Sequence, residues 1–117
     1  MSKQEIRIVT KIIRELSLFL MIHGHHTFQL DTTLEGKTRV FHIVVADLPT
    51  ETLDKIREKI GREREIEVET YGWELLGDID AKTELEIVGL LIDSIDVVTE
   101  GKQTRITLKR ESKYLEK

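Results

Sequence analysis

The sequence predicts an α+β domain built as a two-layer sandwich, with helices on one face of a mixed, mostly antiparallel sheet. Stretches with apolar residues at helical spacing are interspersed with stretches in which apolar and polar residues alternate. The alternating stretches are apolar on one side only, which is typical of a sheet with one covered face. A chain of 117 residues suits one domain. We assign that domain to residues 1–110 and a polar C-terminal tail to residues 111–117.

Composition limits the classes of function. A hydrophobic content of 39% supports a buried core, and the chain has no cysteine. The absence of cysteine and of a signal-peptide pattern predicts a cytoplasmic protein. No stretch approaches the apolar length of a membrane span. The formal net charge of -4, without an extended basic stretch, argues against nucleic-acid binding.

The first predicted helix begins after Ser2. Ser2 and Glu5 form a capping-box pattern, in which each side chain accepts a hydrogen bond from the backbone N–H of the other residue. Apolar residues then recur at helical spacing, and His23 ends this pattern. Gly24 follows as a residue free to adopt positive φ. We expect this helix to cover the apolar face of the sheet.

A β-hairpin is predicted for residues 28–45. Glu35-Gly36 fits a two-residue turn, which would pair Thr33 with Thr38 and Leu30 with Phe41. Strand alternation then places five apolar residues on one face of the sheet. These residues are Phe28, Leu30, Phe41, Ile43 and Val45.

The rest of the chain predicts a helix, a strand, a helix and a closing strand pair. Asp47 is expected to be the N-cap of a helix that ends at Gly61. Residues 65–69 alternate acidic and apolar, as a one-sided strand does, and residues 71–78 fit either a strand or a loop. A second capping box at residues 83–86 opens a helix whose apolar stripe extends to Ile95. The predicted core comprises Leu16, Phe19, Phe28, Leu30, Phe41, Ile43, Leu91 and Ile95.

Several residues follow one another in the order of a known family's motifs. These are Glu15, His23-Gly24, the 28–45 hairpin, Asp47, and Thr104 after the Gly101 turn. In this order they resemble the small ATP-binding modules of the gyrase, chaperone, histidine-kinase and mismatch-repair (GHKL) superfamily, above all the anti-sigma-factor serine kinases. The resemblance covers about residues 15–49 and 83–110. It implies a histidine-kinase ATPase-like fold, ATP with Mg²⁺ as ligand, Glu15 as general base, and nucleotide contacts from Asp47 and Thr104.

Three motif positions depart from that family. Phe19 stands where the family has its Mg²⁺-binding Asn, and Pro49 replaces the glycine of Asp-x-Gly. The Gly-x-Gly expected before the last helix reads Lys82-Thr83-Glu84. A phosphate cradle needs unobstructed backbone N–H groups and a countercharge, and Glu84 would repel a phosphate. We therefore interpret the chain as a nucleotide-binding scaffold whose site has decayed or been repurposed.

The candidate site residues also have structural interpretations. Glu15 has Lys11 and Arg14 nearby as ion-pair partners, and Asp47 fits a helix cap. His23, His25 and His26 lie close together in sequence, with His42 across the hairpin, and imidazoles at such spacing can bind a metal ion. Adjacent histidines diverge in an extended chain, however, and a helix C-terminus favours His through the helix dipole alone.

Three functions remain open from the sequence. The leading hypothesis is a non-catalytic regulatory module that binds another protein, of a sigma-factor-like or anti-anti-sigma-like kind by resemblance. The alternatives are an ATP-dependent anti-sigma-type serine/threonine kinase and a metal-responsive protein with a His cluster. We also expect a homodimer, because Tyr71, Trp73, Leu75 and Leu76 crowd into a glycine-flanked segment that must be covered by the core or by a second chain.

Overall fold

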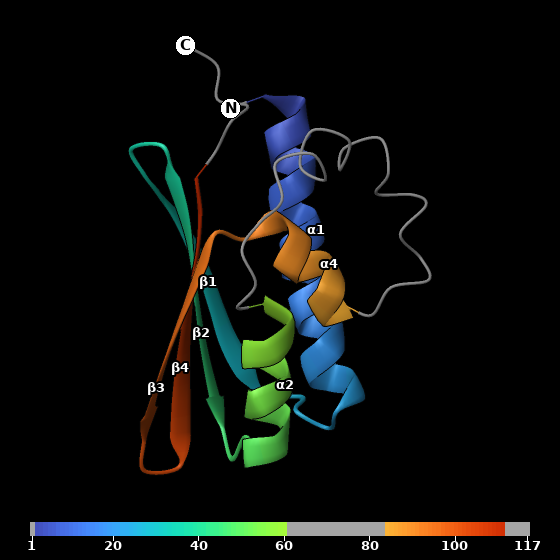
Figure 1. The fold of residues 1–117 in the computed structure, drawn as a ribbon, viewed down its shortest axis with the longest axis vertical. Coiled ribbons are helices and arrows are strands. Elements are labelled where there is room, and N and C mark those ends of the chain that lie inside the picture. Colours follow the sequence, from blue (N-terminus) through green and yellow to red (C-terminus); the bar gives the residue numbers. More distant parts are fainter. Residues whose placement is uncertain (1, 61–83, 112–117) are drawn as a thin grey trace.

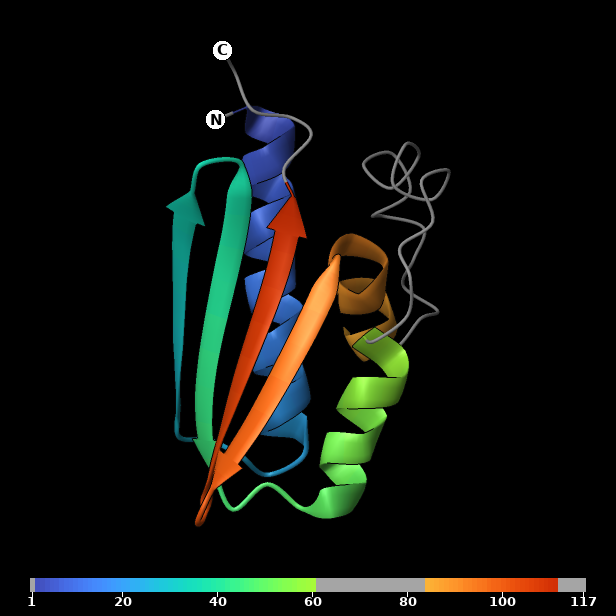
Figure 2. The ribbon, with the colours of Figure 1, turned by 60° about the vertical axis from the view of Figure 1, so that its left-hand side comes forward.

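A computed structural model describes residues 2–60 and 84–111, and it confirms the α+β two-layer sandwich (Figure 1). The elements, in chain order, are α1 (Lys3–Ile22), β1 (Phe28–Glu35), β2 (Thr38–Ala46), α2 (Thr50–Ile60), α4 (Glu84–Leu91), β3 (Ser94–Glu100) and β4 (Gln103–Glu111). The described strands form one antiparallel sheet in the order β1-β2-β4-β3. The helices cover one face, and no described element covers the other (Figure 2).

Both ends of α1 are capped, although only the Ser2 half of the predicted capping box is seen, because the Glu5 carboxylate accepts hydrogen bonds from Arg110 instead. The Ser2 hydroxyl accepts a hydrogen bond from the Glu5 backbone N–H at 3.1 Å. At the C-terminus, Gly24 has a φ of 88°. Its N–H bonds the Met21 carbonyl, and the His25 N–H bonds the Leu20 carbonyl. This pair of bonds is a Schellman motif, which satisfies carbonyls that the helix itself leaves open.

The predicted hairpin register is wrong by two residues. The turn is Gly36-Lys37, so Leu30 pairs with Ile43 and Glu35 pairs with Thr38. Gly36 has a φ of 66°, the sign that a primed turn requires at its first central position. A shift of two residues keeps every side chain on its own face. The predicted apolar face is therefore confirmed even though the pairing is not.

Two further boundaries differ from the sequence prediction. Helix α4 ends at Leu91, and Ile95 lies on β3 opposite Leu108 rather than on the helix. Asp47 is not the N-cap of α2, because that helix begins at Thr50 and its first carbonyl acceptor belongs to Pro49. The predicted strand at 65–69 and the segment at 71–78 lie outside the described residues.

The core fills the space between the sheet and the helices. Within it, the predicted core residues Leu16, Phe19, Phe41, Ile43 and Leu91 are buried. Phe28, Leu30 and Ile95 are partly buried and pack against the same cluster, as expected for residues of the two edge strands. None of the helices in the described ranges combines the length and hydropathy needed to cross a membrane.

A buried ion pair joins the two ends of the domain. Arg110 on β4 is 0% exposed, and Glu5 on α1 is 1% exposed. The Arg110 Nε and Nη2 atoms donate to the two Glu5 carboxylate oxygens at 3.0 and 3.1 Å. Its Nη1 atom donates to the Leu91 carbonyl at the end of α4. One guanidinium thus ties α1, α4 and β4 together.

We predict that Glu5→Gln lowers the free energy of unfolding by about 3–5 kcal/mol, because it leaves the Arg110 charge buried without its counterion. Urea denaturation followed by circular dichroism measures this change. Glu35→Gln, the same replacement at the exposed last residue of β1, is the matched control and should stay within about 0.5 kcal/mol of the wild type. Equal unfolding midpoints for the two variants would show that the pair does not stabilise the fold.

Candidate functional site

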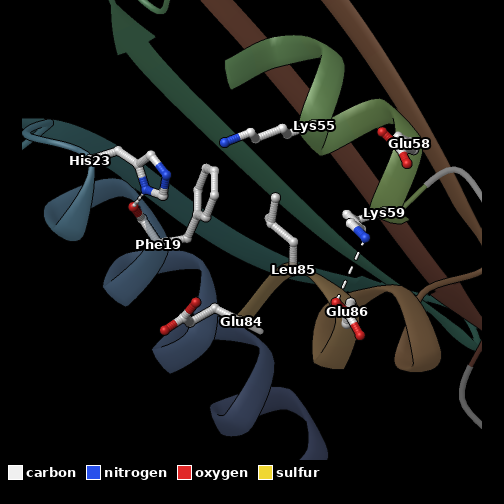
Figure 3. A pocket seen from close by; sticks show the side chains of 8 residues that line it. All are labelled: Phe19, His23, Lys55, Glu58, Lys59, Glu84, Leu85 and Glu86. Atoms are coloured by element: carbon white, nitrogen blue, oxygen red, sulfur yellow. Dashed lines mark hydrogen bonds and ion pairs between the residues drawn. The ribbon is translucent and has the colours of Figure 1, made fainter. Parts of the chain in front are cut away.

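A pocket opens between the ends of three helices (Figure 3). Its walls are the C-terminal end of α1, the second half of α2 and the first turn of α4. Its volume is about 370 Å³. The described residues that line it are Phe19, His23, Lys55, Glu58, Lys59, Glu84, Leu85 and Glu86.

The α1 wall consists of two stacked rings. Phe19 and His23 are four residues apart, so they lie on the same side of the helix. Their ring centroids are 4.2 Å apart, and the ring planes are inclined by 33°. The His23 Nδ1 atom lies 2.9 Å from the Phe19 carbonyl oxygen, which holds the imidazole in place (Figure 3). This wall is therefore aromatic and apolar, with one imidazole edge.

The opposite walls carry charges of both signs. Lys59 Nζ lies 3.7 Å from a carboxylate oxygen of Glu86, which links α2 to α4. Lys55 extends toward Phe19 and His23 in Figure 3. Glu58 and Glu84 add two more carboxylates, so with neutral His23 the lining has one more negative than positive charge. Glu84 and Glu86 lie in the first turn of α4, where their negative charges offset the positive end of the helix dipole. The N-terminus of α4 therefore attracts an added anion less strongly.

A glycine sets the distance between α2 and α4. A Cβ atom placed on Gly89 would overlap the carbonyl oxygen of Lys59. The two helices can therefore approach only because position 89 has no side chain. This close contact brings Lys59 beside Glu86 and forms that side of the pocket.

Glu15 lies four residues before Phe19 in sequence but is not among the residues that line the pocket. It is 4% exposed, one helical turn before Phe19. Lys11 Nζ lies 3.0 Å from its Oε1 atom, and Arg14 Nη1 lies 3.6 Å away. The carboxylate that the resemblance assigns as a general base is thus held in an ion pair on its own helix.

Asp47 and Thr104 lie beside the β3–β4 turn instead. Asp47 has a φ of 55°, and its N–H donates to the Lys102 carbonyl at 2.7 Å. Thr104 is buried at 2% exposure on β4, between Val45 and Thr99 of the neighbouring strands. Neither residue is among the described lining of the pocket. The structure therefore brings Phe19, His23 and Glu84 together, but not Glu15, Asp47 or Thr104 with them.

His23 and His42 make separate contacts in different elements. His23 is engaged with Phe19, whereas His42 lies on β2 with its Nδ1 atom 3.4 Å from the Thr107 hydroxyl. No three His, Cys, Asp or Glu side chains within residues 2–60 and 84–111 are arranged to hold a metal ion. The lysines and glutamates of α2 were not singled out from the sequence, because their spacing is that of an ordinary solvated helix face.

Comparisons with protein-family models, with curated proteins and with solved structures find no match to this chain. Membership of the GHKL superfamily therefore stays a prediction from the sequence.

We predict that Gly89→Ala destabilises the protein by about 1–3 kcal/mol, the usual cost of forcing added atoms into a packed contact. The sign is informative, because the same change at an open helix position raises stability by up to about 1 kcal/mol through helix propensity. Chemical denaturation gives the free energy of unfolding. A gain in stability would show that α2 and α4 do not approach as closely as the structure indicates.

Proposed function

We propose that this protein is a non-catalytic regulatory module that binds another protein, on a GHKL-like scaffold whose nucleotide site has lost its ligands. The observation that carries the proposal is the composition of the pocket between α1, α2 and α4. Phe19 and Glu84, which stand at the Mg²⁺-ligand and glycine-loop positions of the resemblance, both line that pocket. Residues 19 and 84, which are far apart in sequence, thus lie in one pocket, and this supports the proposal.

The chemistry of the pocket opposes a nucleoside triphosphate. A phenyl ring offers Mg²⁺ no oxygen ligand, and this cation prefers oxygen. Without it, the roughly four negative charges of ATP lose the neutralisation on which phosphoryl transfer depends. The side chains of the described lining do not supply that neutralisation, because its carboxylates outnumber its ammonium groups. Glu15 is also held by Lys11 rather than open to the pocket.

A regulatory protein partner follows from the same reasoning. If the scaffold keeps its fold but not its ligand chemistry, its remaining use is to present surface to another macromolecule. The resemblance points to a partner of the sigma-factor-like or anti-anti-sigma-like kind. The residues expected to form a homodimer, Tyr71, Trp73, Leu75 and Leu76, lie outside the described residues, so the homodimer stays a prediction.

We predict that millimolar Mg-ATP and Mg-ADP leave the melting temperature unchanged. A ligand at about 100 times its dissociation constant would stabilise the folded state by about 2.7 kcal/mol, which differential scanning fluorimetry detects easily. A clear rise with Mg²⁺ and nucleotide together would overturn the degenerate-site proposal and favour the serine/threonine kinase alternative.

Glu84→Lys is the matched control for this experiment. The replacement turns the excess negative charge of the pocket into an excess positive charge at the N-terminus of α4, where anions bind readily. We expect ATP to stabilise this variant weakly and without a need for Mg²⁺. Stabilisation of the variant alone shows that the assay senses the pocket and that the wild-type charges exclude the nucleotide.

A further inference from the structure

The face of the sheet opposite the helices carries a shallow groove of about 380 Å³. It is lined by His42, Ile43, Val44, Val98, Glu100, Arg105, Ile106 and Thr107. In Figure 2 this face has no described element over it. The groove crosses β2, β4 and β3, so it lies over the middle and one edge of the sheet.

A row of three residues crosses the groove. Val44 on β2 pairs with Arg105 on β4, and Arg105 pairs with Val98 on β3. All three side chains point away from the helices, because their neighbours Ile43, Ile106 and Val97 pack into the core. Val98 is 43% exposed, and Arg105 is exposed between the two valines. Arginine is one of the residues enriched at binding hot spots, and apolar side chains around such a contact exclude water from it.

The Arg105 guanidinium has no ion-pair partner within residues 2–60 and 84–111. Two acidic residues of β3, Asp96 and Glu100, lie on this face two residues to either side of Val98, and Glu100 lines the groove. The groove therefore presents two apolar positions with a cation between them and an acidic group at one end.

We propose that this groove binds an amphipathic helix of the protein partner. The face of that helix that contacts the groove carries two apolar side chains with a carboxylate between them. The inference rests on the proposed function and locates its binding surface. Val44 and Val98 lie two strand spacings apart, or about 9.5 Å. Residues i and i+7 of an α-helix are about 10.5 Å apart along its axis, and a carboxylate at i+3 or i+4 falls midway, over Arg105. A Lys or Arg next to the second apolar residue faces Glu100.

Charge argues against a second copy of this chain as the occupant. Two identical sheets that stack in the aligned manner about a twofold axis place β1 over either β1 or β3 of the other copy. Both edge strands carry acidic residues on this face, namely Asp31 and Glu35 on β1, and Asp96 and Glu100 on β3. Like charges would therefore oppose one another in either arrangement, whereas a partner helix with its own pattern avoids this cost.

The test is an NMR titration of the ¹⁵N-labelled full chain with a synthetic alanine-rich helix of about 18 residues. The helix carries Leu at i and i+7, Glu at i+3 and i+4, and Lys at i+8. We expect shifts at the amides of Val44, Val98 and Arg105. Arg105→Glu should weaken binding at least about tenfold, as expected for the loss of a central charged contact. A helix with Lys in place of both Glu residues should restore binding to that variant.

Lys109→Glu is the matched control, since Lys109 is exposed on the same face of β4 but lies outside the groove. It should change affinity by about twofold or less, as a peripheral charge does. No shift on the outer face, shifts at the helix-lined pocket, or equal loss in both variants would overturn the groove proposal. Any of these results leaves the proposed function standing if nucleotides also fail to stabilise the protein, so the two failures are distinguishable.

Discussion

One buried guanidinium contacts three elements of the fold. Arg110 comes from the last strand, and its counterion Glu5 comes from the first turn of the first helix, 105 residues earlier. Removing two charges from water has an unfavourable desolvation free energy. Hydrogen bonds from all three nitrogens of the guanidinium to protein oxygens offset it here. The third bond runs from Arg110 Nη1 to the carbonyl of Leu91, the last residue of α4. This carbonyl has no partner within the helix, so the bond holds the end of α4 beside β4. The same contact therefore orients both α1 and α4, which are two of the three walls of the pocket.

Local rules predicted the elements well and their long-range contacts poorly. The Ser2 cap and the Gly24 terminus were predictable because each depends on residues within one turn of the helix. The carboxylate of Glu5 was assigned to a capping box by the same local reasoning, yet it pairs with a residue at the far end of the chain. The hairpin register failed for a related reason. Two registers that differ by two residues bury the same side chains, so the pattern of apolar residues does not separate them.

The candidate site was predictable in part. Phe19, His23 and Glu84 were identifiable from the sequence because they stand at motif positions of the resemblance, and all three line the pocket. Lys55, Glu58 and Lys59 carried no such signal, since charged residues on a short amphipathic helix normally face solvent. They reach the pocket because α2 packs closely on α4, and that approach depends on the missing side chain at position 89. A glycine inside a helix, with the apolar residues Val88 before it and Leu90 after it, was the available clue.

The edge strands of the sheet are less suited to binding a partner than the outer face, which is the face opposite the helices. A bare edge strand can pair with a strand from another chain, but β1 and β3 both carry carboxylates along their length. Charged edge residues of this kind oppose strand-to-strand association. The helix-covered face is closed by the core, and the described lining of its pocket is aromatic on one side and carries charges of both signs on the other. The outer face differs from both, because Val44, Arg105 and Val98 lie in one row across three hydrogen-bonded strands. Paired strands hold those side chains at a fixed spacing, so binding there orders fewer groups than binding to a flexible loop.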